Sequence, residues 1–163
     1  MNAYGKYISA TSALLILLAL GMNRAEAADT IVWNTNYDAA RAEAKKSGKL
    51  IMVDFFAHWC GTCKELDRNV YPDKRVVAAG SKVIALKLDV DLDEVEPIAR
   101  KYDVSALPAV LLLNENGKIV GKIKAREAAS FAASLEKFIM AYHPGSGSKS
   151  PRHPRSHSDN PVR

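Results

Sequence analysis

A strand-length apolar run that leads directly to a pair of cysteines is the most constraining feature of this sequence. The chain has only two cysteines, Cys60 and Cys63, and residues 50–56 (LIMVDFF) precede them closely. The run alternates little between apolar and polar side chains, which predicts a strand covered on both faces. A helix is expected to start at the cysteines and continue to Val70, before Pro72 interrupts it. The sequence therefore predicts a buried strand joined to a helix whose first turn carries both thiols.

That position favours thiol chemistry. The N–H groups of a helix's first turn are unpaired and carry partial positive charge, so a thiolate there is stabilised and its pKa falls. Cys60 is expected to be an exposed nucleophile. Cys63, one turn later on the same face, is within disulfide reach and can resolve a mixed disulfide. Gly61 leaves room beside the sulfur for the backbone of a partner.

Other uses of such a pair remain open. Two cysteines three apart can form half of a zinc site, and thiolates also suit Cu(I). A zinc site needs two more ligands, but no second pair is present, and three of the four histidines (His143, His153, His157) follow the last predicted helix, leaving only His58 near the pair. A purely structural disulfide is disfavoured because closing so short a loop removes little unfolded-state entropy. We expect no metal, and no cofactor besides the redox-active disulfide.

The rest of residues 28–142 predicts a single α/β domain. Asn36 can cap a first helix that Gly48 ends, and the turn sequence 114–117 (NENG) predicts a hairpin. This first helix is expected at 37–46, and further helices at 74–79 (capped by Asp73), 92–102 (capped by Asp91) and 127–142. Strands are expected at 83–90, 109–113 and 118–123, with a short one at 31–33. This order predicts a central mixed β-sheet flanked by helices on both faces.

Residues 53–64 (VDFFAHWCGTCK) resemble the active-site segment of the thioredoxin superfamily. Leu107-Pro108 resembles that family's cis-proline loop, and residues 101–104 and 116–118 match its layout. The resemblance covers about residues 30–141. It implies a thioredoxin fold and protein disulfide oxidoreductase activity.

The resemblance also implies roles for individual residues. Pro108 would be cis and lie against the cysteines, and the backbone of Leu107 would pair with a bound substrate chain. From the sequence alone, Pro108 can equally be a strand-edge proline. Trp59, Gly61 and Thr62 would shape the docking surface, although a partly buried packing tryptophan is equally compatible with the pattern.

Asp54 is an acid within the buried run, six residues before Cys60. An unpaired buried charge is costly, so this group is expected to be paired or to have a raised pKa. The resemblance implies that it moves protons to and from Cys63. Lys87 stands where thioredoxins carry a lysine near that acid; a strand lysine that extends into solvent is the alternative. His58 either tunes Cys60 or is an idle surface residue.

The sequence departs from ordinary thioredoxins at several points. The segment after the cysteines, 65–73, and the opening 37–50 look more like the C-terminal periplasmic domain of DsbD-type disulfide reductases. The loop 124–126 (KAR) lacks the glycine that thioredoxins use for partner docking. The Gly61-Thr62 dipeptide supplies no charge to stabilise a thiolate, which favours a reductant or exchange role. A reductant in an oxidising compartment implies a membrane-borne electron donor as partner.

The N-terminus reads as a signal peptide over residues 1–27. Its positively charged start contains Lys6, and its apolar stretch covers 8–20. The cleavage site has small residues in Ala25-Glu26-Ala27. The apolar stretch is shorter than the roughly 20 residues that span a bilayer, although an uncleaved anchor is the alternative. Export, with the periplasm as destination, places the dithiol where disulfides form and persist.

Residues 143–163 predict a disordered basic tail rich in Pro, Ser and His, because they offer almost no apolar surface to bury. Solvation alone, loose metal binding or contact with an anionic surface would all suit it. This tail carries much of the formal net charge of +5, so the domain itself is nearly neutral and nucleic-acid binding is disfavoured.

These features predict an exported, monomeric thiol–disulfide oxidoreductase that reduces or exchanges disulfides in client proteins. The alternative is a client- or metal-binding module, as in cytochrome or copper-site assembly, because the fold alone does not prove turnover.

Overall fold

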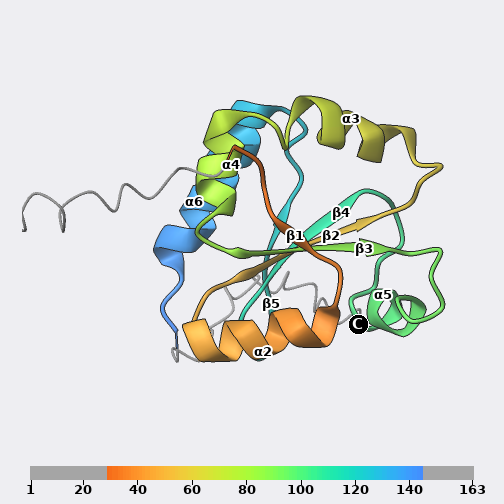
Figure 1. Cartoon of the computed structure of the whole chain (residues 1–163), viewed down its shortest axis with the longest axis horizontal. Coiled ribbons are helices and arrows are strands. Elements are labelled where there is room, and N and C mark those ends of the chain that lie inside the picture. Colours follow the sequence, from red (N-terminus) through yellow and green to blue (C-terminus); the bar gives the residue numbers. More distant parts are fainter. Residues whose placement is uncertain (1–28, 145–163) are drawn as a thin grey trace, which may run out of the picture.

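The computed structural model describes residues 29–144, which form one five-stranded sheet with helices on both faces (Figure 1). The strands, in the spatial order β1-β3-β2-β4-β5, are β1 (Trp33–Asn34), β2 (Ile51–Phe56), β3 (Ile84–Asp89), β4 (Ala109–Leu113) and β5 (Ile119–Ile123). The helices are α2 (Tyr37–Ser47), α3 (Gly61–Asn69), α4 (Lys74–Gly80), α5 (Glu96–Lys101) and α6 (Ala128–Ala141).

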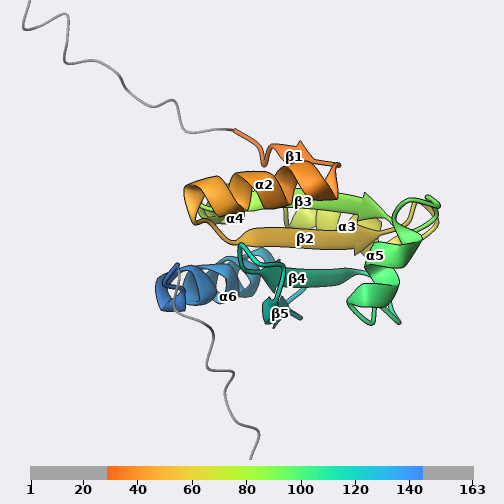
Figure 2. The same ribbon diagram turned by 90° about the horizontal axis from the view of Figure 1, so that it is seen from below.

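The sheet is mixed, as the sequence predicts. β3 pairs in parallel with both β1 and β2, whereas β4 runs antiparallel to β2 and to β5. Figure 2 shows the sheet from another side, with β5 at the edge farthest from β1. The α/β class and the thioredoxin-type arrangement of a mixed sheet between helices are thus confirmed.

The central strand β2 is buried on both faces, which explains its continuous apolar sequence. Ile51, Val53 and Phe55 are fully buried on the face covered by α2 and α5. Met52 belongs to the opposite core, against α3, α4 and α6. Because side chains alternate along a strand, Asp54 also faces that second core.

The expected helix over 92–102 is shorter than predicted. α5 begins only at Glu96, and Val95 at its N-cap makes no side-chain capping bond. Pro97 lies in the first turn, where a proline suits a helix start. Asp91, the expected cap, instead accepts a hydrogen bond from the indole of Trp59 at 3.2 Å. The residues between β3 and α5 therefore form turns beside the cysteines.

The predicted hairpin between β4 and β5 is held by side chains of its own turn. The Asn114 carboxamide oxygen accepts hydrogen bonds from the backbone N–H groups of Asn116 and Lys118, at 3.0 and 2.9 Å. Gly117 adopts a φ of 74°, which favours glycine, and its carbonyl accepts a hydrogen bond from the Tyr102 hydroxyl at 3.0 Å.

The predicted signal peptide (1–27) and nearly all of the predicted tail (145–163) lie outside the described residues. Across residues 29–144, no helix has the length and apolar character needed to cross a membrane.

Candidate active site

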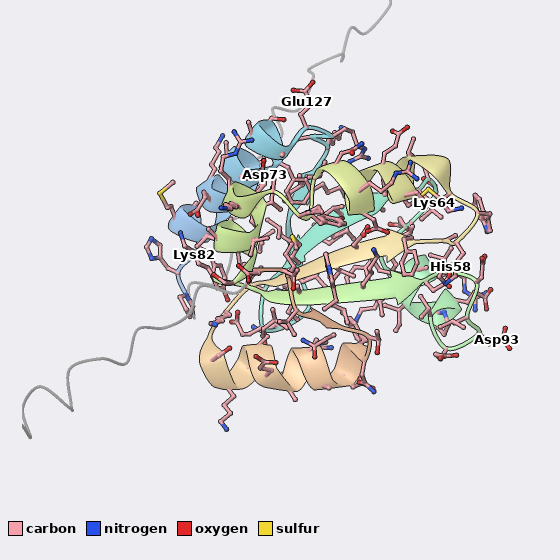
Figure 3. The ribbon with its side chains drawn as sticks, turned by 45° about the horizontal axis from the view of Figure 1, so that its top comes forward. His58, Lys64, Asp73, Lys82, Asp93 and Glu127 are labelled. Carbon is pink, nitrogen blue, oxygen red and sulfur yellow. A yellow bond between two sulfur atoms is a disulfide. The ribbon has the colours of Figure 1, made fainter. Side chains whose placement is uncertain are left out.

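The two cysteines lie at the start of α3 and form a disulfide, with their Cα atoms 5.3 Å apart. Cys60 is the N-cap residue, and its sulfur accepts a hydrogen bond from the backbone N–H of Cys63 at 3.2 Å. Figure 3 shows this disulfide beside Lys64, at the end of the molecule where β2 leads into α3. The local arrangement is therefore the one that stabilises a thiolate on Cys60 once the disulfide is reduced.

In this oxidised state Cys60 is less exposed than expected. Cys60 is only 5% exposed and Cys63 only 2%. Both pack with Ala57, and the half-buried Phe56 and Leu107 lie against them. Tertiary packing of the β2–α3 loop and of the segment before β4 covers the pair, which a local sequence pattern does not reveal. Space remains on one side, because a side chain added at Gly61 would meet no atom within 4 Å.

The segment before β4 brings a distant part of the chain to the dithiol. The Leu107–Pro108 peptide bond is cis, and Leu107 packs against the cluster that contains both cysteines. Pro108 is buried at the start of β4, which pairs with β2. The structure thus places Leu107 against the cysteines, and Pro108 follows it across the cis bond.

Trp59 and His58 line the other side of the pair. Trp59 is 70% exposed, so it is not a buried packing residue, and its indole N–H is held by Asp91. His58 is exposed, and its Nε2 lies 3.3 Å from Asp89 Oδ2. Asp89 at the end of β3 and Asp91 in the loop that follows therefore hold His58 and Trp59 from outside.

Asp54 is buried in β2, the strand that leads to the cysteines, at 2% exposure. Burial raises the pKa of its carboxyl to about 6, and the nearby carboxylate of Asp67 adds to the increase. Tyr71, Lys87 and Arg126 oppose this effect. Among the described residues, Asp54 Oδ1 has no hydrogen-bond partner of normal geometry. The carboxyl is thus poised to exchange a proton near neutral pH.

Tyr71 is a component of this site that the sequence analysis missed. It is 5% exposed, packs edge-on against Trp33 and Phe131, and its hydroxyl interacts with the Asp54 carboxyl without reaching normal hydrogen-bond geometry. Burial, reinforced by the negative charge of Asp54, raises the pKa of Tyr71 well above its usual value. The phenol therefore stays protonated. No local pattern marks it, because it follows α3 and only the fold carries it to Asp54.

Lys87 does not extend freely into solvent. Its side chain is 16% exposed and forms an ion pair with Asp67 of α3, a second residue the sequence analysis missed. Its ammonium also lies over the rings of Trp33, Phe56 and Tyr71, at 5.5, 4.8 and 5.5 Å. The lysine is therefore fixed among aromatic rings, close enough to lower the pKa of Asp54.

Arg126, in the loop after the edge strand β5, reaches the surroundings of Asp54 and Pro108. Its Nη2 donates a hydrogen bond to the carbonyl of Pro108 at 3.1 Å, and its charge lowers the pKa values of Asp54 and Tyr71. In the sequence this loop stands out only by its lack of a glycine. Within residues 29–144, no three His, Cys, Asp or Glu side chains gather as metal ligands would.

Comparison with known proteins agrees with this geometry. A family model described as thioredoxin-like matches residues 32–115. A thioredoxin from Echinococcus granulosus is 37% identical over 100 residues, which cover 61% of this chain and 88% of that protein. The thiol:disulfide interchange protein DsbD of Ralstonia nicotianae is 33% identical over 109 residues, covering 63% of this chain but only 17% of the much longer DsbD. Among solved structures, a thioredoxin from Thermus thermophilus superimposes with a TM-score of 0.58 at 25% identity, covering 66% of this chain and 86% of that one.

The chain therefore belongs to the thioredoxin-like family. With a Cys-x-x-Cys pair at disulfide distance in the family's position, it is a protein disulfide oxidoreductase by class.

Proposed function

We propose that this protein reduces or exchanges disulfides in client proteins through the Cys60–Cys63 dithiol. The observation that carries the proposal is the N-cap geometry of Cys60, whose sulfur accepts the N–H of Cys63 at the start of α3. A sulfur held in this way ionises readily and attacks disulfides as a thiolate.

The reaction proceeds in two exchanges. The Cys60 thiolate attacks one sulfur of the client disulfide, a mixed disulfide forms, and the first client thiolate leaves. Cys63 then loses its proton and attacks the Cys60 sulfur, which closes the intramolecular disulfide and releases the second client thiolate. The client gains two electrons and, after protonation, two protons. We assign Asp54 to the transfer of the Cys63 proton, because it is a buried carboxyl with a pKa of about 6 on the strand that leads to the pair.

Client docking is assigned to the surface around the disulfide. Exposed Trp59, open Gly61 and Thr62 form one side, and Thr62 Oγ1 lies 3.5 Å from the Cys60 sulfur. The backbone of Leu107, before the cis-Pro108 bond, forms the other side. Lys87 supports proton transfer through its effect on the pKa of Asp54.

We further propose that the protein is exported and acts as a reductant supplied by a membrane-borne donor. The signal-like N-terminus supports export, and the similarity to part of DsbD supports the interchange role. The Gly61-Thr62 dipeptide places no charged side chain between the cysteines, which supports a reducing direction.

Trapping of mixed disulfides tests the mechanism. With Cys63→Ser, a client disulfide is expected to accumulate as an adduct on Cys60, whereas Cys60→Ser gives no adduct. Metal-free turnover of a protein disulfide by the wild type separates an enzyme from a binding module. Absence of both adduct and turnover would contradict the proposal.

The reduction potential tests the direction. A reduction potential of about −270 mV, as in thioredoxin, supports a reductant. A value near that of the oxidant DsbA, about −120 mV, would make the protein a disulfide donor instead.

A further inference from the structure

A groove adjoins the cis-proline loop on the side away from Trp59. Its volume is about 240 Å³, and it runs between the loop before β4 and the edge strand β5. Pro108 lines it, so the groove begins where the docking surface around the disulfide ends. Among its other lining residues are Asp103, Ser105, Lys122, Lys124 and Arg126.

The groove is open because the helices leave this part of the sheet uncovered. α2 packs mainly on β3 and β2, and Figure 2 shows β5 at the far edge of the sheet. Ile123, the last residue of β5, is buried against the α6 side, so Lys122, the strand residue before it, lies on the opposite face. Lys124 follows the strand and lines the same groove. Both lysines are exposed, and neither forms an ion pair with another described residue.

Three cations and one acid therefore border the groove. Arg126 is held in place by its bond to the Pro108 carbonyl, which fixes a positive charge at the end nearest the dithiol. Asp103 is the only carboxylate among the lining residues. Glu127 follows Arg126, but Figure 3 shows it projecting outward at the start of α6.

The other side of the cis-proline loop has the opposite charge. A second groove of about 360 Å³ lies there, lined by Trp59 and Leu107 together with Glu96 and Arg100, which pair with each other at 3.0 Å. The adjoining segment, from the end of β3 at residue 89 to the start of α5 at residue 96, carries five acids: Asp89, Asp91, Asp93, Glu94 and Glu96. In Figure 3, Asp93 marks this acidic side below the disulfide.

We propose that the groove along β5 binds an acidic segment of the client, so that the protein prefers disulfides flanked on that side by Asp or Glu. This inference rests on the proposed function and specifies its substrate class. Lysine and arginine side chains that form no ion pair with another described residue attract carboxylates, raising both encounter rate and affinity. The acidic loop on the other side repels the same segment and so fixes its placement.

Lysines on an edge strand also deter strand-to-strand association between copies. That role does not depend on the client's charge. Client preference, not stability or solubility, is therefore the decisive readout.

The test uses two synthetic peptides with the same intramolecular disulfide, one flanked by three Glu and the other by three Gln. For each enzyme form, the ratio of kcat/KM for the Glu peptide to that for the Gln peptide is measured. A ratio cancels any general loss of folded enzyme. The groove variant is Lys122→Glu/Lys124→Glu, and the control is Lys45→Glu/Lys46→Glu, which makes the same charge change at exposed positions of α2.

The wild type is expected to prefer the Glu peptide, and the groove variant to lower the ratio by roughly tenfold, since two attractions become repulsions. Lys122→Arg/Lys124→Arg should retain the preference, the control should leave it unchanged, and added salt should weaken it. No preference in the wild type, or an equal drop in the control, would overturn the groove assignment while turnover of both peptides upholds the proposed function. Failure to reduce either peptide would overturn both.

Discussion

Asp54 and Lys87 are register partners on the adjacent parallel strands β2 and β3, and they face the same core. The carboxyl is buried without a hydrogen bond of normal geometry, whereas the ammonium is held by Asp67 and three aromatic rings. The lysine thus lowers the pKa of Asp54 without neutralising it. A buried acid is kept incompletely paired on the strand that leads to the dithiol, at a cost in stability.

Replacing Asp54 with Asn should stabilise the protein at neutral pH. The folded-state pKa of about 6 exceeds the ordinary value of 3.8, so folding takes up protons between these values and wild-type stability falls as pH rises from about 4 to 6. The shift corresponds to a penalty of about 3 kcal/mol, which is nearly complete above about pH 7, where the carboxyl of the folded state is ionised. Asp54→Asn should therefore be more stable by up to that amount at pH 8, and similar to wild type below pH 4. It should also slow the release of mixed disulfides.

Urea unfolding of both oxidised proteins between pH 4 and 8 measures this difference. A difference that stays constant with pH would contradict the buried titration of Asp54.

Lys87→Met and Asp67→Asn should move the pKa of Asp54 in opposite directions. The lysine lowers that pKa and Asp67 raises it, so the first substitution should raise the value above 6 and the second should lower it, each by roughly half a unit to one unit. A carbon NMR titration of the Asp54 carboxyl reports the value directly. Shifts in the same direction would show that a conformational change, and not charge, dominates.

Gly61→Ala tests whether this position is kept open for clients. The added Cβ meets no atom of the folded protein, and alanine favours a helix, so stability should be unchanged or higher by up to about 1 kcal/mol. The reduction rate of a protein client should fall several-fold relative to that of a small organic disulfide. Equal effects on both substrates would argue against a docking role.

Gly117→Ala should destabilise the domain by about 1–2 kcal/mol, because a φ of 74° disfavours residues with a Cβ. The new Cβ would also lie 3.2 Å from Arg41 Cζ and from the Tyr102 hydroxyl. Thermal unfolding of this variant beside Gly61→Ala, the same change at an open position, measures the combined effect of the positive φ and of these contacts. Equal melting temperatures for the two variants would refute it.

Local sequence patterns predicted most of the helices and strands, because caps and turns are formed by residues close together in the sequence. Asn36 and Asp73 cap α2 and α4 as expected, and the turn 114–117 closes the hairpin. The start of α5 was misplaced by four residues, because Asp91 has the residue type of a cap but bonds to Trp59 instead. At Asp91 the hydrogen bond to a residue distant in the sequence therefore prevails over the local preference of aspartate for a helix N-cap.

The sequence by itself determined the strand–dithiol–helix unit, since burial of the apolar run and the position of Cys60 and Cys63 follow from adjacent residues. It also marked Asp54 as costly to bury. Only the tertiary structure decided what surrounds that acid. Asp67 lies in α3, Tyr71 directly after it and Arg126 after β5, and their distances to Asp54 depend on how these segments pack against β2. Electrostatic interactions depend on distance in space, not on separation along the chain, so the environment of the acid emerges only from the fold.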